Sequence, residues 1–477
     1  MHAPNRIPGD LVMKQAREDL LAWERSERLA ELRWRDVPLW RLIRNRIIGD
    51  YLERQGVRGR SNYNRPGFRA AAAFLVGMLV SVGHIFRLRR RRVLFIGFPR
   101  RRREGTVWVD PLSDPLIEVL GESDVLCIEK PFGGVHFRPP RTRHIVYYDW
   151  VTAVASAASF LFEWSGRRAA RDALSALADS VSRRFDMQAR DVRRMTSRAL
   201  VQFRVEAALM RAALSLIKPE VVLLTSRTIH FPIIYASKCS GARVLELQHG
   251  VPNTLGYKCV TVWDPHLDPD WMLTFGTYWN ERDWGLPRDR IQAIGYRHIW
   301  QSRAALMSRR SDRGDAVMLL SQPEMSARLA NAFWKIAAAN DDVQFLLKLH
   351  PQDIADWQRR YPVGLRTNVR VCNDPAADLY GLFSECCAVV GHNSTALFEA
   401  SFFGLKVGIL NFDGTNECPA LEHIGRFNLF ELREPRSLAA MLAAPIDDGV
   451  PDTPFLADFD ARQFERLVGR AAPGRSA

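Results

Sequence analysis

The sequence predicts an α/β protein with two doubly wound domains of parallel sheet, preceded by a helical extension. The chain has 477 residues, more than one ordinary hydrophobic core accommodates. From Val93 onward, short apolar runs alternate with longer helix-like segments, which is typical of parallel sheets covered by helices on both faces. The same alternation starts again after a segment that contains Gly285, Pro287 and Gly295, and we expect the hinge between the domains there.

The apolar pattern divides the chain into five parts. Residues 1–68 have apolar side chains at helical spacing and predict a helical extension. Residues 69–92 form an apolar segment that ends in arginines. The first Rossmann-like domain is predicted over 93–295, with strands at 93–98, 125–129, 144–148, 221–225, 243–247 and 271–275. The second is predicted over 296–430, with strands at 317–320, 343–349, 369–372, 388–390 and 407–410, and 431–477 is a tail with a terminal helix.

Charge and cysteine usage narrow the class of partner. The net charge of +14 and the pI near 9.8 indicate a partner rich in phosphate, such as a nucleotide or an anionic membrane surface. The arginines gather beside the apolar segment and no aromatic-rich binding strand accompanies them, so no nucleic acid partner is expected. The seven cysteines are scattered without a C-x-x-C pair, which predicts small core residues in a reducing compartment.

The segment Ala70–Phe86 raises the question of a membrane. It is shorter than the ~20 apolar residues of an ordinary span, and Arg87 and Arg89–Arg92 follow it directly. A buried helix, a true span and a helix lying in the interface of the cytoplasmic leaflet are the three interpretations. The arginines favour the interfacial helix, which predicts a peripheral protein on the inner face of the cytoplasmic membrane.

Polar side chains follow several predicted strands at the point where each strand ends. His249 follows a strand of the first domain, His350 follows one of the second, and Asn393 follows another. Ligands of open α/β sheets bind outside the carboxyl ends of the strands. We therefore expect these clusters to face one another across a single cleft between the domains.

The stretch GHNSTALFEA predicts an anion site at the start of a helix. Asn393 or Ser394 is a natural N-cap, and with Thr395 it stands where free backbone N–H groups and the helix dipole attract a phosphate. Glu399 lies on the same helix face as Thr395. It either reaches the ribose hydroxyls of a bound nucleotide or is a solvated surface acid.

The stretch LLKLHPQD predicts a second phosphate contact. Strand alternation places Lys348 and His350 on one face, where both can donate hydrogen bonds, and Pro351 ends the strand. Next to the helix-start anion site, these residues form a phosphate clamp for a leaving nucleotide.

The stretch RVLELQHGVPN supplies candidates for a general base. Glu246 and Gln248 share a strand face, His249 follows at the turn, and Gly250 lets the backbone change direction. Either His249 is the base and Glu246 orients it, or Glu246 is the base with a pKa raised by burial. The alternative is structural: Glu246 pairs with an arginine and His249 caps a helix. Gln248 and Gly250 are expected to line the acceptor side of the cleft.

These motifs, with LTFGTYW, IQAIGY and a Gly256-Tyr257 pair, resemble the bacterial capsular-polysaccharide glycosyltransferases of the GT-B fold. The polysialyltransferase and Kdo-transferase-like groups are similar over roughly residues 90 to 425, and the CDP-glycerol glycerophosphotransferases of teichoic acid synthesis more distantly. The resemblance implies that His350, Pro351 and Ser394 or Thr395 hold a CMP moiety. Where the polysialyltransferases have two acids and a glycine, this chain has Gln248, His249 and Gly250, which leaves the base and the donor open.

The function expected from the residues and this resemblance is a metal-independent glycosyltransferase. It moves a sugar from a nucleotide-sugar, which is a substrate and not a cofactor, to a glycan or lipid-linked acceptor of a surface polysaccharide. Asp268-Pro269-Asp270 resembles a metal-binding pair, but it precedes a strand and is expected to face away from the ligand edge. A glycerophosphotransferase and a nucleotide-sugar epimerase of the same architecture remain alternatives.

Overall fold

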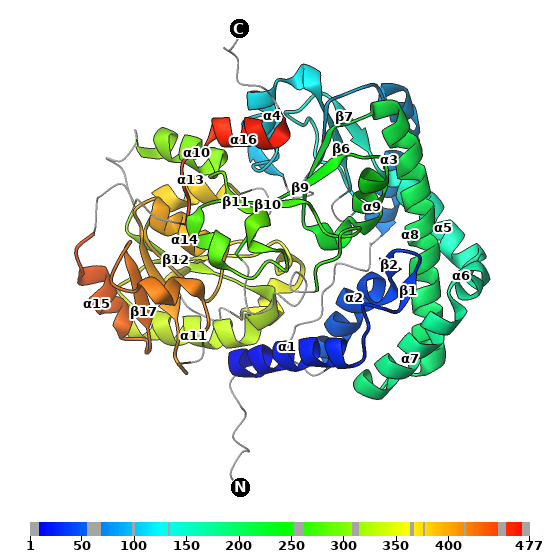
Figure 1. Cartoon of the computed structure of the whole chain (residues 1–477). Helices are drawn as coiled ribbons and strands as arrows, with labels where there is room; N and C mark the ends of the chain where they lie inside the picture. The colour runs from blue at the N-terminus through cyan, green and yellow to red at the C-terminus, as the bar shows by residue number, and fades with distance from the viewer. Residues whose placement is uncertain are drawn as a thin grey trace.

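The computed structural model describes residues 9–54, 68–97, 101–131, 134–251, 262–307, 314–362, 367–374, 377–414, 416–446 and 455–469. Within these ranges the chain forms two parallel sheets, each covered by helices on both faces (Figure 1). The predicted architecture of two Rossmann-like domains is therefore confirmed. We call the domain of the seven-stranded sheet the first lobe and that of the six-stranded sheet the second lobe. Gly256 and Tyr257, named in the sequence resemblance, lie outside the described residues.

The first lobe is built on seven parallel strands. Their order across the sheet is β11 (Ile291–Ala293), β10 (Trp271–Thr274), β9 (Arg243–Leu247), β8 (Val221–Thr225), β3 (Val93–Ile96), β6 (Val125–Glu129) and β7 (Ile145–Tyr147). The strands are apolar throughout because both faces are covered. In β3, Val93 and Phe95 pack in the cluster that contains α4 (Asp114–Leu120), whereas Leu94 and Ile96 pack in the cluster of α8 (Ala189–Ile217) and α9 (Phe231–Cys239).

The second lobe is built on six parallel strands. Their order is β14 (Val369–Cys372), β13 (Phe345–Lys348), β12 (Ala316–Leu320), β15 (Cys386–Gly391), β16 (Lys406–Leu410) and β17 (Leu429–Leu432). One face packs in the cluster of α13 (Leu379–Ser384) and α14 (Thr395–Phe402), and the other in that of α11 (Ser326–Ala339) and α15 (Ser437–Ala443). The cluster on the α14 side also contains buried residues of the first lobe, so one apolar core runs through both lobes.

Two strands of the parallel sheets were not predicted from the sequence, and neither were the short antiparallel pairs outside these sheets. β17 has only four residues, and β11 has three, which include the polar Gln292. Such short segments carry little of the period that distinguishes strands from loops. β11 lies inside the segment expected to be the hinge, where α10 (Arg297–Met307) follows it.

The N-terminal extension consists of α1 (Gly9–Ser26), β1 (Arg33–Trp34), β2 (Val37–Pro38) and α2 (Leu39–Arg54). It packs on α7 (Arg171–Phe185) and α8 of the first lobe. In Figure 1 the extension lies at the bottom of the molecule, and α7 and α8 lie on its right-hand side. Aromatic rings fill this contact: the Trp23 and Trp40 centroids are 5.5 Å apart, and the Trp40 and Phe185 centroids 6.3 Å apart.

The apolar segment after the extension is helical, as α3 (Phe68–His84). It packs along α5 (Asp149–Leu161) and against β7, and α5, α6 (Glu163–Ala169) and α7 pack in turn on α8. Among the described residues, no helix has both the length and the apolar character needed to cross a bilayer.

The last described residues return to the first lobe. Ala457 N donates to Phe275 O (2.8 Å), and α16 (Ala461–Val468) lies beside α4 and α10 in Figure 1. This crossing explains Gly295: its φ is +83°, and a Cβ there would stand 2.1 Å from Asp458 O. The segment expected as a hinge is thus held by the C-terminal segment. The remaining elements are β4 (Arg102–Glu104), β5 (Val107–Val109) and α12 (Trp357–Arg360).

Candidate functional site

The carboxyl edge of the second sheet carries His350 and Ser321 at the ends of neighbouring strands. His350 N donates to Ser321 Oγ (2.7 Å), and Ser321 Oγ donates to Asp353 Oδ2 (2.7 Å). The ring of His350 accepts a hydrogen bond at Nδ1 from Gln352 N (3.2 Å). An acceptor at Nδ1 leaves the ring proton of a neutral imidazole on Nε2. His350 is half-buried at this edge, as a phosphate donor would need to be.

Lys348 and Pro351 flank His350 with different exposure. The Lys348 ammonium is half-buried and donates to Leu349 O at 3.2 Å. Burial lowers the pKa of Lys348, although Cys372 and Asp374 oppose the shift. Pro351 is exposed where the chain leaves the strand. Lys348 and His350 are separated by the buried Leu349, in agreement with the predicted alternation.

The end of β15 and the start of α14 form the next part of the same edge. Ser394 is the N-cap, and its Oγ accepts a hydrogen bond from Ala396 N at 3.3 Å. Asn393 is 7% exposed, and its Oδ1 has no hydrogen-bond partner among the described residues. A buried amide oxygen in this state is costly unless a ligand or water satisfies it. Backbone N–H groups at a helix start also attract anions, so both features favour a ligand here.

The two lobes meet directly at this helix start. Val251 N, at the end of the described loop after β9, donates to Thr395 Oγ1 at 3.0 Å. A Cβ on Gly250 would stand 3.2 Å from the same hydroxyl, so the glycine permits the close approach. His249, the residue before Gly250, is exposed. The loop that carries the predicted base therefore contacts the predicted anion site.

Gln248 shapes this loop. It is fully buried, and its Oε1 accepts a hydrogen bond from Phe275 N (2.8 Å) while its Nε2 donates to Gly250 O (3.1 Å). It also lines a small hollow at the carboxyl edge of the first sheet. The other lining residues are Leu247 and residues of three segments: 111–116, 273–275 and 294–298. Gln248 thus positions the turn and borders the space where an acceptor was expected.

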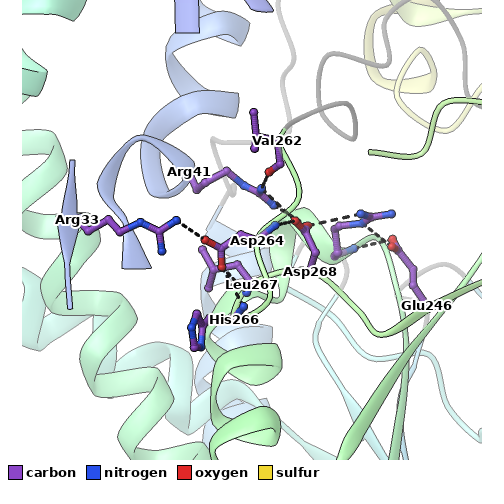
Figure 2. A network of polar contacts seen from close by, with 9 residues as sticks. Arg33, Arg41, Glu246, Val262, Asp264, His266, Leu267 and Asp268 are labelled. Atoms are coloured by element: carbon purple, nitrogen blue, oxygen red, sulfur yellow. Dashed lines mark hydrogen bonds and ion pairs between the residues drawn. The ribbon is translucent and has the colours of Figure 1, made fainter. Parts of the chain in front are cut away.

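Glu246 has the structural partner that the sequence left as an alternative. Its Oε1 accepts a hydrogen bond from Arg227 N (2.9 Å) and its Oε2 one from Arg227 Nε (2.5 Å). Arg227 NH1 also lies 3.4 Å from Asp268 Oδ1, and Arg41 NH2 of the N-terminal extension donates to the same oxygen at 2.7 Å (Figure 2). In Figure 2 the Glu246 carboxylate points into this network, toward Asp268. His249 is therefore the stronger candidate for the base.

Asp268 and Asp270 are both used inside the first lobe. Burial raises the pKa of Asp268, but the charges of Arg41 and Arg227 outweigh this and lower it below its usual value. Asp270 accepts hydrogen bonds from Lys238 Nζ and Val244 N, both at 2.8 Å. Across the described ranges, no cluster of three or more His, Cys, Asp and Glu side chains has metal-binding geometry.

Glu399 corrects one expectation. It is 5% exposed, so it is not a solvated surface acid. Its Oε2 lies 3.8 Å from Arg102 NH2 of the first lobe, and the Arg102 guanidinium lies 4.3 Å from the centre of the Tyr380 ring. Burial raises the pKa of Glu399, with Arg102 and Tyr380 opposing the shift. Glu399 forms a buried charge pair between the lobes, and its predicted contact with a ribose is not tested by this arrangement.

Sequence reasoning missed several groups at these edges. Ser321 directly follows a predicted strand, so the rule that identified His350 could have found it. Asn416 carries no such signal, although its Nδ2 donates to His392 O (2.9 Å) and Leu410 O (2.7 Å) and holds the loops together. Arg227 was also missed, because its partner Glu246 lies on another strand.

A second buried charge cluster lies at the ends of β6 and β7. His136 Nδ1 is 2.6 Å from Glu129 Oε1, and His136 Nε2 is 2.8 Å from Asp149 Oδ2. Burial lowers the pKa of His136, but the hydrogen bonds to Asp149 and Glu129 outweigh it and raise the pKa above its usual value. The ring also stacks on Tyr147, with centroids 3.6 Å apart. This cluster holds the loop after β6 against α5.

No protein-family model matches the sequence, and no curated protein matches it. Among solved structures, the chain is similar to UDP-GlcNAc 2-epimerase from Methanocaldococcus jannaschii (TM-score 0.48, 10% identity, 80% of this chain and 99% of that one). It is also similar to UDP-N-acetylglucosamine 2-epimerase from Rickettsia bellii (0.45, 14%, 80% and 96%). A third similar structure is the wall teichoic acid polymerase TagF (0.43, 11%, 89% and 95%). At these identities and TM-scores the likenesses assign neither a family nor an activity, and the reaction has to be inferred from the residues.

Proposed function

We propose that this protein is a glycosyltransferase that moves a sugar from a nucleotide-sugar to a glycan or lipid-linked acceptor. The observation that carries the proposal is the contact between the lobes, in which Val251 N donates to Thr395 Oγ1 at 3.0 Å. The loop that makes this contact also carries the exposed His249, and at the helix start of the other lobe Asn393 has a buried amide oxygen without a partner among the described residues. A base for the acceptor and a site for the leaving group are what sugar transfer requires.

The second lobe supplies the groups for the nucleotide. The N–H groups at the start of α14 would bind the phosphates, with the Lys348 ammonium and the Nε2–H of His350 on the neighbouring strand as further donors. As the bond between the anomeric carbon and the phosphate oxygen breaks, its electron pair passes to the phosphate. Fixed donors stabilise this developing charge without having to reorganise.

The first lobe supplies the base. The imidazole of His249 would take the proton of the acceptor hydroxyl while the acceptor oxygen forms its bond to the anomeric carbon. Gln248 and Gly250 set the turn that presents this ring. Glu246 does not enter the step, since Arg227 binds both of its oxygens.

We also propose that the reaction takes place at the inner face of the cytoplasmic membrane and extends a surface polysaccharide. The exposed arginines after α3 support this location, because anionic headgroups attract them. A lipid-linked acceptor is anchored in the same membrane and would then meet the enzyme at the membrane surface.

Titration calorimetry of the whole chain with CMP, CDP, UDP, GDP and their sugars tests the nucleotide site. We expect micromolar-range binding of at least one nucleotide and about tenfold or greater weakening in His350→Ala, from loss of a charge-assisted hydrogen bond. His144→Ala is the matched control. His144 is an exposed histidine of the first lobe, at the amino end of β7 and therefore away from the carboxyl edge of that sheet. If His350→Ala and the natural protein bound every nucleotide with equal affinity, the assignment of His350 to a phosphate clamp would be wrong.

Product analysis then tests the reaction. His249→Ala should lower turnover about 10²–10⁴-fold with nucleotide affinity kept, as expected for loss of a general base. A nucleotide-sugar converted to its epimer without an acceptor would make the protein an epimerase instead. Transfer of glycerophosphate from CDP-glycerol would make it a glycerophosphotransferase.

A further inference from the structure

From Val76 to Phe86, helix α3 and the turn after it direct large apolar side chains outward. On the side that packs against the protein, Gly77, Ser81 and His84 are buried. On the other side stand large apolar side chains with high exposed fractions: Val76 (59%), Leu79 (71%), Val82 (50%) and Phe86 (84%), the last just beyond the helix. A helix of a water-soluble domain has the reverse arrangement.

The inner face of α3 is small and polar because of what it covers. A Cβ on Gly77 would stand 2.6 Å from Asp149 Oδ1, so a larger residue would have to displace this carboxylate at the first residue of α5. His84 Nδ1 accepts a hydrogen bond from Tyr147 N at 3.2 Å, at the end of β7. These contacts fix the rotation of the helix about its axis. The outward direction of its apolar residues is therefore imposed by the fold.

A second apolar surface lies on the neighbouring helices. The end of α5 and the start of α6 expose Phe160 (64%), Leu161 (71%), Phe162 (50%) and Trp164 (60%), and α5 also exposes Val154 (47%). This connection is tightly held: Ser197 Oγ of α8 donates to Glu163 O at 2.6 Å, and a Cβ on Gly166 would stand 2.5 Å from Ser197 O. The exposed side chains thus belong to a packed part of the first lobe.

The charges around these two surfaces are mostly positive. Arg87, Arg89 and Arg90 are exposed directly after α3, as are Arg167 and Arg168 in α6. The Arg198 guanidinium of α8 lies 4.3 Å from the centre of the Phe160 ring. The nearby acid Glu163 is already bound by Arg167 at 2.7 Å. Apolar side chains flanked by arginines are complementary to a bilayer with anionic headgroups.

We propose that α3 and the α5–α6 connection together form one docking face for an anionic phospholipid bilayer. We call it the docking face and define it by the outward residues of α3 with Phe86, and by Phe160, Leu161, Phe162 and Trp164. The inference rests on the proposed location at the membrane and is independent of the proposed sugar transfer. It adds the pair of helices α5 and α6 to the single interfacial helix that the sequence predicted.

Vesicle flotation with the full chain tests the docking face. We expect binding to vesicles of equal phosphatidylglycerol and phosphatidylcholine, and about tenfold or greater loss of binding on pure phosphatidylcholine. The double variants Leu79→Asp/Phe86→Asp and Leu161→Asp/Trp164→Asp should each weaken binding by about tenfold or more, since each removes apolar area that the bilayer would cover. Ile446→Asp, an exposed apolar position (38%) in the second lobe, should bind as the natural protein does.

Three results would overturn the proposal. Equal binding to both vesicle types would remove the role of anionic lipid. Full binding by Leu161→Asp/Trp164→Asp would reduce the face to α3 alone. Absence of vesicle binding with a change of sedimentation coefficient in the variants would show that the face covers a second copy of the chain. Circular dichroism of the same variants shows that they are folded, and failure of nucleotide binding by the natural protein would affect only the proposed reaction.

Discussion

The ends of β9 and β15 carry polar residues at equivalent edges of their sheets, but these residues are in opposite states. At the end of β9, the buried charges of Glu246 and Asp268 are balanced by those of Arg227 and Arg41. At the end of β15, Asn393 Oδ1 is buried without a partner among the described residues. A charge-balanced network holds the backbone in place, whereas a buried amide oxygen without a partner among the described residues leaves room for a ligand. The comparison separates structural residues from candidate binding residues at the two edges.

The largest effect is expected where the charge-balanced network is broken. Arg227→Met should lower the free energy of unfolding by about 3–5 kcal/mol, because it leaves Glu246 buried without a countercharge, while Asp268 keeps its ion pair with Arg41. Chemical denaturation followed by circular dichroism measures it. Lys348→Met is the matched change in the second lobe, where the ammonium donates to a backbone carbonyl, and it should cost less than about 1 kcal/mol. Similar losses in the two variants would contradict the comparison.

The pH dependence of stability should come from the junction between the lobes. His298 is buried, and burial, with the charges of Arg102 and Arg141, lowers its pKa from 6.5 to about 3. Glu104 Oε1, 3.9 Å from Nδ1, is too distant to offset this. Between pH 6.5 and 3 the unfolded chain binds a proton that the native chain does not. The stability that the neutral ring contributes is therefore complete above pH 6.5 and is lost as the pH falls.

His298→Gln should remove this proton uptake. Between pH 6.5 and 5 the natural protein should lose about 2 kcal/mol more stability than the variant, from 1.36 kcal/mol per pH unit for one proton. The Asp268 network affects stability at lower pH. Because the pKa of Asp268 is below its usual value of 3.8, the stability that this carboxylate contributes is lost only when the pH falls below 3.8. Denaturation curves at pH 6.5 and 5 separate the two. Parallel losses in both proteins would place the sensitive group elsewhere.

The unpartnered amide of Asn393 should matter for affinity more than for stability. Asn393→Ala should weaken nucleotide binding about tenfold, the equivalent of one hydrogen bond, and leave the free energy of unfolding unchanged or higher. Asn368 provides the contrast: its Nδ2 contacts the carbonyl oxygens of Ala337, Asn340 and Val343 at 3.2, 3.3 and 3.2 Å. Asn368→Ala should lose stability and keep its affinity. Calorimetry measures the nucleotide affinity of both variants, and denaturation measures their free energy of unfolding. If Asn393→Ala lost stability and Asn368→Ala lost affinity, Asn368 and not Asn393 would be the binding residue.

The smallest effect is expected at the contact between the lobes. Thr395→Val keeps the branched shape but removes the acceptor for Val251 N, which should cost about 1 kcal/mol of stability. Thr395→Ser restores a hydroxyl and should recover most of that loss. If valine and serine give the same unfolding free energy, the hydrogen bond contributes nothing measurable.

The sheets could be predicted because their strands are continuous apolar runs, as in VVLLT, and the site could be placed at their carboxyl edges by topology alone. The state of individual residues could not. Glu246 reads equally well as a base or as a paired acid until Arg227, from the end of another strand, is placed beside it. Glu399 and Arg102 are separated by almost three hundred positions, and no local pattern reports their pairing. The periodicity of apolar residues predicts helices and strands, but it does not predict which distant charged residues pair.

The return of the chain's end to the first lobe has a consequence for how the protein is made. Phe455, Phe464 and Val468 belong to the core that contains the strands of the first lobe, and Trp279 Nε1 donates to Phe455 O at 2.7 Å. On the ribosome, the first lobe emerges long before these residues do. Its apolar surface around Trp279 therefore stays uncovered until the second lobe has been synthesised, and we expect the first lobe to be less stable when it is expressed without the C-terminal segment.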